Sequence, residues 1–112
     1  MDRTKYADID VRVAKDAESE TYDAWLGPDR IGTLAYQSVR GTVAMISIAV
    51  EPEYQHHGVA GELIAGALDD VADSGQTVTV ICPVVRTFID EHPQYARLVD
   101  TRHPGIRSRS TR

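Results

Sequence analysis

The sequence predicts a mixed α/β fold, in which an antiparallel N-terminal meander of strands continues into a strand–helix–strand crossover. Three observations predict it. Apolar and polar side chains alternate in several short segments before residue 51, which is the period of a strand. Apolar residues then recur at three- and four-residue steps, and a β-branched segment follows directly. We therefore expect a twisted mixed sheet with flanking helices, built by a chain of 112 residues as one domain.

Four segments of the first half have the strand pattern: Ile9–Val13, Thr21–Leu26, Ile31–Val39 and Thr42–Val50. A Gly-Pro turn separates the second from the third, and an Arg-Gly pair separates the third from the fourth. Links this short favour pairing between neighbours along the chain. The fourth segment is apolar on both faces, so we expect a central strand that is covered on both sides.

The strongest helix pattern follows the loop at residues 53–58. Its apolar stripe consists of Leu63, Ile64, Ala67, Leu68, Val71 and Ala72. Gly75 is the expected C-terminal cap, and Thr77–Cys82 is the expected fifth strand. Because a right-handed crossover returns the chain in the same direction, this strand should run parallel to the fourth.

Pro83 is suited to the first turn of a second helix, which should end before His92. We expect this helix to direct inward its apolar residues Val84, Val85, Phe88 and Ile89. Tyr95–Val99 should form a last short strand or turn. Residues 1–8 should be frayed, and residues 101–112 should form a flexible basic tail behind a single domain of residues 1–100.

The composition narrows the classes of function. A formal net charge of -5 disfavours nucleic acid as the main partner, leaving an accessory role through the basic tail as a remote alternative. No apolar run reaches the ~18 residues that span a bilayer, and the first residues lack a secretory leader pattern. The only cysteine, Cys82, fits a reducing compartment, so we expect a cytoplasmic protein.

The segment from residue 55 to residue 61 lies between the most apolar strand and the best helix pattern. A helix start offers unpaired backbone N–H groups and partial positive charge, and glycines let an anion approach the main chain. A phosphate or pyrophosphate is the natural ligand of such a loop. A glycine-containing strand-to-helix turn is more often a simple connection, and on spacing alone this simpler interpretation is favoured.

Three motifs in order extend this pattern: Gln55-x-x-Gly58-x-Ala60, the pair Cys82-Pro83, and His92-Pro93-Gln94-Tyr95. With these motifs the run from Val50 to Val99 resembles a short, single-domain branch of the GCN5-related N-acetyltransferases. The resemblance implies a sheet that splits between its fourth and fifth strands, with acetyl-CoA in the opening. It also implies a set of cofactor-binding residues: Val50, Gln55, His56, His57, Gly58, Val59, Ala60 and Gly61.

The resemblance implies transfer of acetyl from acetyl-CoA to a primary amine on a small molecule or a protein. Cys82 is the candidate catalytic residue, as acetyl acceptor or as a group that orients the thioester; its alternative role is apolar packing. The branch typically carries His and Glu on the fourth strand, where this chain has Ser47 and Ala49, so a ready general base is missing. The alternative function is a non-catalytic acetyl-CoA sensor or regulatory module.

The remaining polar residues have simpler interpretations. His56 and His57 have no further ligands at a recognised spacing, so we expect no metal. The acidic residues of the first helix, Glu62, Asp69, Asp70 and Asp73, should form a solvated face. His92 should cap the preceding helix or pack beside Tyr95. Because the chain is short, the acceptor site should be either open or completed by a second copy in a homodimer.

Overall fold

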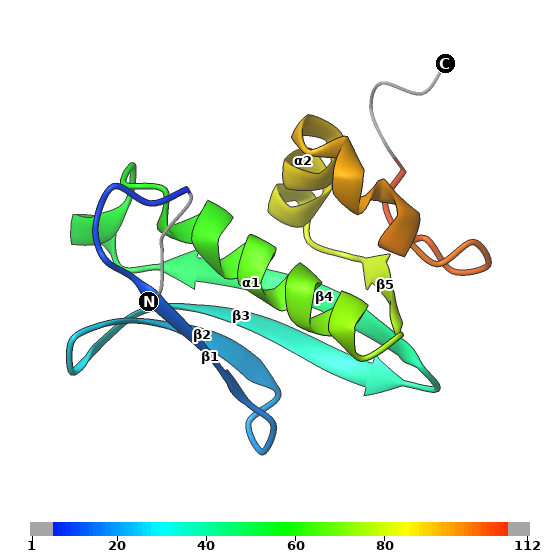
Figure 1. Cartoon of the computed structure of the whole chain (residues 1–112), viewed down its shortest axis with the longest axis horizontal. Coiled ribbons are helices and arrows are strands. Elements are labelled where there is room, and N and C mark those ends of the chain that lie inside the picture. Colours follow the sequence, from blue (N-terminus) through cyan, green and yellow to red (C-terminus); the bar gives the residue numbers. More distant parts are fainter. Residues whose placement is uncertain (1–5, 108–112) are drawn as a thin grey trace.

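The computed structural model describes residues 6–107 and shows a five-stranded mixed sheet with helices beside it (Figure 1). The strands follow the order β1 (Arg12–Asp16), β2 (Thr21–Leu26), β3 (Asp29–Val39), β4 (Thr42–Val50) and β5 (Thr77–Val80). Pairing is antiparallel from β1 to β4 and parallel between β4 and β5. The predicted mixed fold, with its meander and crossover, is confirmed.

Helix α1 (Val59–Asp73) covers one face of the sheet with its apolar stripe. It ends as expected, because Gly75 takes a φ of 73° and the amide of Gln76 donates to the Val71 carbonyl. Helix α2 (Pro83–Glu91) follows β5 directly, with proline in its first turn. Two short 3-10 helices complete the chain: η1 (Pro52–Tyr54) precedes α1, and η2 (Pro93–Leu98) replaces the expected last strand or turn.

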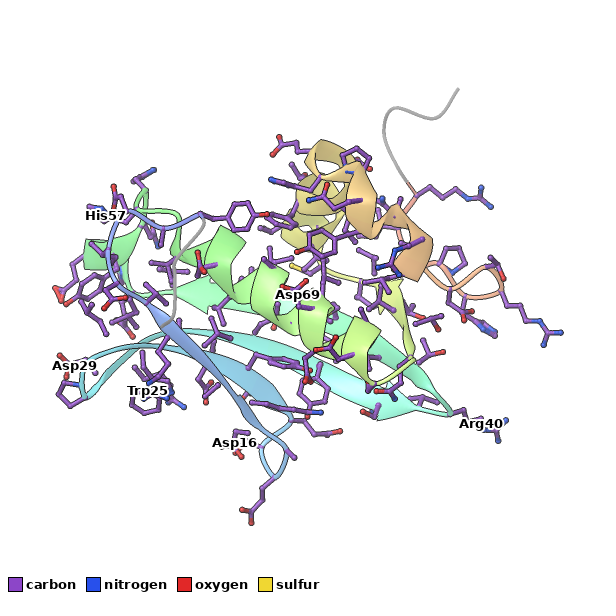
Figure 2. The ribbon with its side chains drawn as sticks, in the orientation of Figure 1. Asp16, Trp25, Asp29, Arg40, His57 and Asp69 are labelled. Carbon is purple, nitrogen blue, oxygen red and sulfur yellow. The ribbon has the colours of Figure 1, made fainter. Side chains whose placement is uncertain are left out.

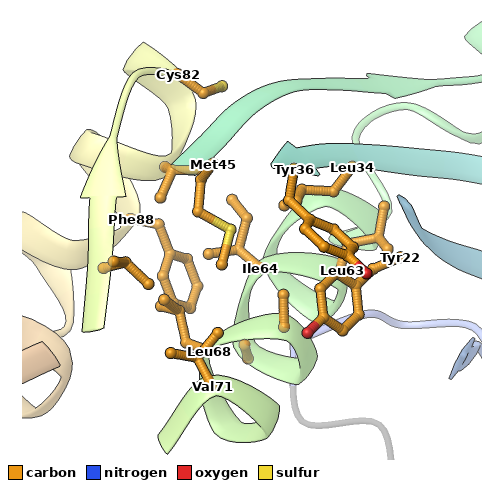
Figure 3. Close-up of a cluster of buried hydrophobic side chains, with 14 of the residues drawn as sticks. Tyr22, Leu34, Tyr36, Met45, Leu63, Ile64, Leu68, Val71, Cys82 and Phe88 are labelled. Atoms are coloured by element: carbon orange, nitrogen blue, oxygen red, sulfur yellow. The ribbon is translucent and has the colours of Figure 1, made fainter. Parts of the chain in front are cut away.

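The core lies between α1 and the inner face of the sheet and extends to α2 (Figure 3). Leu63, Leu68 and Met45 have no exposed surface there. Burying a side chain of this size contributes about 1.5–3 kcal/mol. Tyr22 and Tyr36 pack against each other with ring centroids 5.1 Å apart. This core fixes α1 over β2, β3 and β4, and so fixes where the helix begins.

The first strand lies later in the chain than expected, at Arg12–Asp16 and not at Ile9–Val13. Lys15, beyond the end of the expected strand, continues the inward alternation of β1. Its ammonium lies 5.8 and 5.6 Å from the ring centroids of Tyr22 and Tyr36 and 3.5 Å from Asp70. A long side chain whose charge reaches partners this way suits an inward strand position.

Two expectations about burial were wrong. Strand β4 is covered on one face only: Val43 and Met45 are buried on the side of α1, whereas Ile46, Ser47 and Ala49 are exposed. In α2, Val84 is 46% exposed and Arg86 is buried in its place. The Arg86 guanidinium is held by Asp90 at 2.9 Å and by the Ile106 carbonyl at 3.3 Å.

The described part of the expected flexible tail, residues 101–107, is held against the free edge of β5. Val80 donates to the Pro104 carbonyl at 3.0 Å and accepts from the Ile106 amide at 2.7 Å. The Thr79 hydroxyl donates to the His103 carbonyl at 2.6 Å. Backbone groups on the edge of β5 need partners, and this segment supplies them. Residues 108–112 lie outside the described residues.

Candidate functional site

The sheet opens between β4 and β5 at Met45. Its carbonyl accepts both the Ile81 and the Cys82 amides, each at 3.0 Å, and the strand pairing ends there. Within residues 6–107, no strand pairs with Ile46–Val50 on that side. Ile46, Ile81 and Val84 are exposed by 39%, 46% and 46% around the opening. An apolar ligand with amide groups would find both strand-edge partners and apolar contacts here.

Helix α1 begins beside this opening with the predicted glycine-containing loop. Gly58 is its N-cap with a φ of 81°, and His56 takes a φ of 69°. The first helical hydrogen bond joins the Glu62 amide to the Gly58 carbonyl at 3.1 Å, so the preceding amides of the helix start have no partner within the helix. The Gln55 side chain donates to the Val50 carbonyl at 3.1 Å and ties the loop to the end of β4. Val59 anchors the helix start in the core.

A cavity of about 420 Å³ lies between α1 and α2, next to the loop. Ala60 and Gly61 form its wall on α1, and Val84 and Phe88 form its wall on α2. A Cβ on Gly61 would lie 3.2 Å from the Tyr6 Cβ and 3.6 Å from Phe88. Glycine at position 61 therefore makes room for the Tyr6 side chain, which lines this cavity beside the positive end of the helix.

The N-terminal segment Tyr6–Asp8 crosses the start of α1 (Figure 1), where the sequence predicted frayed residues. The Tyr6 and Ala7 amides donate to the Glu62 carboxylate at 2.8 and 3.1 Å. The Asp8 amide donates to the His57 carbonyl at 2.9 Å, and the two side chains meet at 2.9 Å. Figure 2 shows His57 beside this segment. No local pattern announces these contacts, because they join residues far apart in the chain.

The backbone of this segment lies directly against Gly58. A Cβ on Gly58 would overlap the Tyr6 carbonyl oxygen and lie 2.9 Å from the Ala7 Cα. Glycine is thus required at position 58 for two reasons: its backbone is left-handed, and the backbone of Tyr6 and Ala7 leaves no room for a Cβ. The space that was expected to admit a phosphate is bordered here by a peptide group.

Cys82 lies at the junction of the opening and α2. It is the N-cap residue of α2, and its amide bonds to Met45, but its side chain makes no capping hydrogen bond. The residue is only 4% exposed, and its thiol is free of any disulfide. Its side chain belongs to the buried hydrophobic cluster that Figure 3 shows, together with Met45 and Phe88. A thiol here would have to be reached through the opening between β4 and β5.

The outer face of the sheet carries one buried carboxylate that sequence reasoning missed. Asp23 is 4% exposed, and its oxygens lie 2.8 Å from the Thr33 hydroxyl and 4.0 Å from Arg30. Thr33 pairs in register with the exposed Ala49. Only the strand register brings Asp23 opposite Thr33, and the sequence does not fix that register.

The acidic residues of α1 are not simply a solvated face. Asp70 accepts the Tyr22 hydroxyl at 2.6 Å, and Asp69 accepts the Tyr95 hydroxyl at 3.0 Å. Burial, followed by the hydrogen bond and negative charge of the carboxylate, raises the pKa of both phenols well above the usual value. These pairs tie the sheet and η2 to α1 and are structural. The predicted cap is present: Nδ1 of His92 lies 2.8 Å from the Phe88 carbonyl.

Across residues 6–107, no three His, Cys, Asp or Glu side chains gather closely enough to hold a metal ion. No helix in that range is long and apolar enough to cross a membrane.

Comparison with known proteins adds one finding. Comparison with curated proteins gives no match. The family model described as GCN5-related N-acetyl-transferase matches residues 21–98. The matched stretch contains β2 to β5, the loop at residues 55–61, Cys82 and both helices, whereas Tyr6–Asp8 lies outside it. Since the match covers more than half of a chain that has the corresponding mixed sheet, the protein belongs to the GCN5-related N-acetyltransferase family.

Proposed function

We propose that this protein is an N-acetyltransferase that takes its acetyl group from acetyl-CoA and passes it to a primary amine. Family membership supports acyl transfer. The observation that carries the finer proposal is a juxtaposition: the glycine-containing start of α1 lies beside the unpaired edge of β4. One element suits a pyrophosphate, and the other suits the amide-containing arm of the same molecule.

The residues present fit coenzyme A. Gly58, Ala60 and Gly61 keep side chains away from the helix start, where the dipole favours an anion. His56 and His57 lie within the loop, and either ring carries a positive charge when it is protonated. The edge at Ile46–Val50 offers backbone donors and acceptors, and Ile46 and Val84 offer apolar contact.

When bound, acetyl-CoA supplies an acyl group activated as a thioester. The chain contributes binding and orientation: the loop holds the anionic end, and the strand edge aligns the arm toward the opening at Met45. A backbone N–H on the open edge of β4 can stabilise negative charge that develops on the acyl oxygen. Cys82, beside that opening, is the group in this chain that can accept the acyl or orient it.

A second function, cofactor sensing without turnover, is favoured by two observations. Ser47 and Ala49 offer no titratable group on β4, and Cys82 is almost fully buried. The two functions differ in a measurable way, because a sensor binds acetyl-CoA without consuming it. The acceptor of the enzyme is a small molecule or a protein amine, at a site that is open or completed by a second copy.

Titration with acetyl-CoA, followed by incubation with an amine library and mass spectrometry, tests the proposal. Ligand at a hundredfold excess over its dissociation constant should stabilise the fold by about 2.7 kcal/mol. Gly58→Val should lose that stabilisation, whereas Gly75→Val, with a similar φ at the other end of α1, should keep it. An unmoved midpoint at millimolar acetyl-CoA would refute cofactor binding. Tight binding with no acetylated amine would support the sensor.

A further inference from the structure

We propose that Tyr6–Asp8 is an inhibitory strap, which must leave the start of α1 before the pyrophosphate of coenzyme A can bind there. The inference rests on the proposed function and adds regulation of the same site. The strap lies outside the matched residues 21–98, so it belongs to the part of the chain that the family model does not describe.

The strap is fastened by its backbone at three points. Two amides, from Tyr6 and Ala7, share the carboxylate of Glu62 in the first turn of α1. The third amide, from Asp8, bonds to His57 within the loop itself. Hydrogen bonds from backbone N–H groups to a carboxylate are stronger than those to a neutral acceptor. The segment is therefore held in one register and is not simply laid on the surface.

The Tyr6 ring provides a fourth attachment at the wall of the cavity between α1 and α2. It meets Phe88 edge-on at 5.4 Å and His92 edge-on at 5.2 Å. Phe88 and His92 are stacked 4.0 Å apart, so the ring rests on a preformed aromatic pair. The strap thus forms one wall of the cavity that borders the loop.

Strap and pyrophosphate compete for the same features of the loop. The Tyr6 carbonyl fills the gap left by the missing Cβ of Gly58, so a phosphate oxygen cannot occupy that gap at the same time. The Tyr6 and Ala7 amides donate to Glu62, so the strap covers the first turn of α1, where the helix dipole favours an anion. The Asp8 carboxylate contacts the His57 imidazole, which could otherwise contact a phosphate.

The expected consequence is a lower apparent affinity. A strap closed in about 90–99% of molecules weakens cofactor binding roughly 10- to 100-fold relative to an open chain. Its attachments are partly exposed, with the Asp8 and His57 side chains 68% and 42% exposed, so single changes should release it in part.

Amide exchange measured by NMR on the full chain, with and without saturating coenzyme A, tests the mechanism. Coenzyme A should slow exchange in residues 55–61 and speed it at Tyr6 and Ala7. Slower exchange both in residues 55–61 and at Tyr6 and Ala7 would mean that the segment forms part of the binding site. That result would overturn the strap proposal but not cofactor binding. Binding to the loop with unchanged exchange at Tyr6 and Ala7 would also overturn it.

Affinity supplies the second readout, with a matched pair of variants. Asp8→Ala should tighten coenzyme A binding about two- to fivefold relative to Asp10→Ala, which makes the same charge change. Asp10 is exposed and forms no hydrogen bond with the loop among the described residues. Adding Tyr6→Ala to Asp8→Ala should reach about tenfold or more. Equal affinities for all variants would overturn the strap, and failure of every chain, released or not, to bind would instead refute the proposed function.

Discussion

The contact between Tyr6 and Gly58 yields the sharpest structural prediction. Gly58→Ala adds a Cβ at a φ of 81°, where it would overlap the Tyr6 carbonyl oxygen. Gly75→Ala is the matched control, because Gly75 takes a φ of 73° with nothing within 4 Å of its added Cβ. Both changes place alanine in the left-handed region, which costs about 1–2 kcal/mol. Only Gly58→Ala must also displace the strap or the loop.

The added cost at Gly58 has an upper bound, because the strap can leave. If the strap is closed in about 90–99% of molecules, its displacement costs roughly 1.4–2.7 kcal/mol. For a domain of this size that difference lowers the melting temperature of Gly58→Ala by roughly a further 5–10 °C relative to Gly75→Ala. Urea unfolding gives the same comparison as a free energy.

A double-mutant cycle assigns the extra cost to the strap. In a chain that begins at Asp8, the Tyr6 carbonyl is gone, so Gly58→Ala should cost no more than Gly75→Ala. Equal costs for the two substitutions in the full chain would refute the contact. So would an extra cost at Gly58 that persists after truncation, since the clash would then come from another group.

Three further predictions concern catalysis, a phenol and the C-terminal segment. Cys82→Ser should retain acetyl-CoA binding by calorimetry but lose most turnover if the thiol accepts the acetyl group; turnover at the wild-type rate would leave Cys82 a packing role only. Tyr22→Phe should lower the free energy of unfolding by about 1–1.5 kcal/mol at pH 7, because the hydrogen bond to Asp70 is lost from a partly exposed carboxylate. The raised pKa of Tyr22 means that its contribution is complete below the ordinary value near 10 and is lost as pH rises above it, so urea curves of the two proteins should converge above about pH 10; a constant gap would contradict the pair. Arg86→Met should cost about 2–4 kcal/mol and speed amide exchange at Ile106, whereas Arg97→Met, at an exposed position, should change neither; equal effects would refute the anchoring role.

Much of the fold was readable from local pattern. The strand boundaries at Thr21–Leu26 and Thr42–Val50 were predicted as observed, because alternation and turn residues mark both ends of each segment. The cap at Gly75 and the proline start of α2 were also predicted, since each depends on the backbone preference of one residue. The first strand was misplaced because Lys15 looks like a turn residue until its partners across the sheet are known.

Only part of the candidate site could be predicted from local sequence pattern. The glycine loop and Cys82 could be named from sequence, but the face of β4 that stays open depends on where β5 stops pairing. Asp23, Arg86 and Tyr6 were missed because each has a partner outside its own helix or strand: Thr33 for Asp23, the Ile106 carbonyl for Arg86 and Gly58 for Tyr6.

The sequence by itself determined most of the strands and both α-helices, that a crossover joins β4 to β5, and that a glycine-containing helix start lies between them. Those features follow from periodicity and backbone preference over a few residues. Only the tertiary structure decided that Tyr6 lies on Gly58, that Asp69 and Asp70 hold tyrosines, and that residues 101–107 close the edge of β5. Such contacts arise because packing one face of α1 on the sheet brings together segments that are distant in the chain. The entropy cost of closing the intervening loops and the energy of the contacts themselves enter only once that packing is complete.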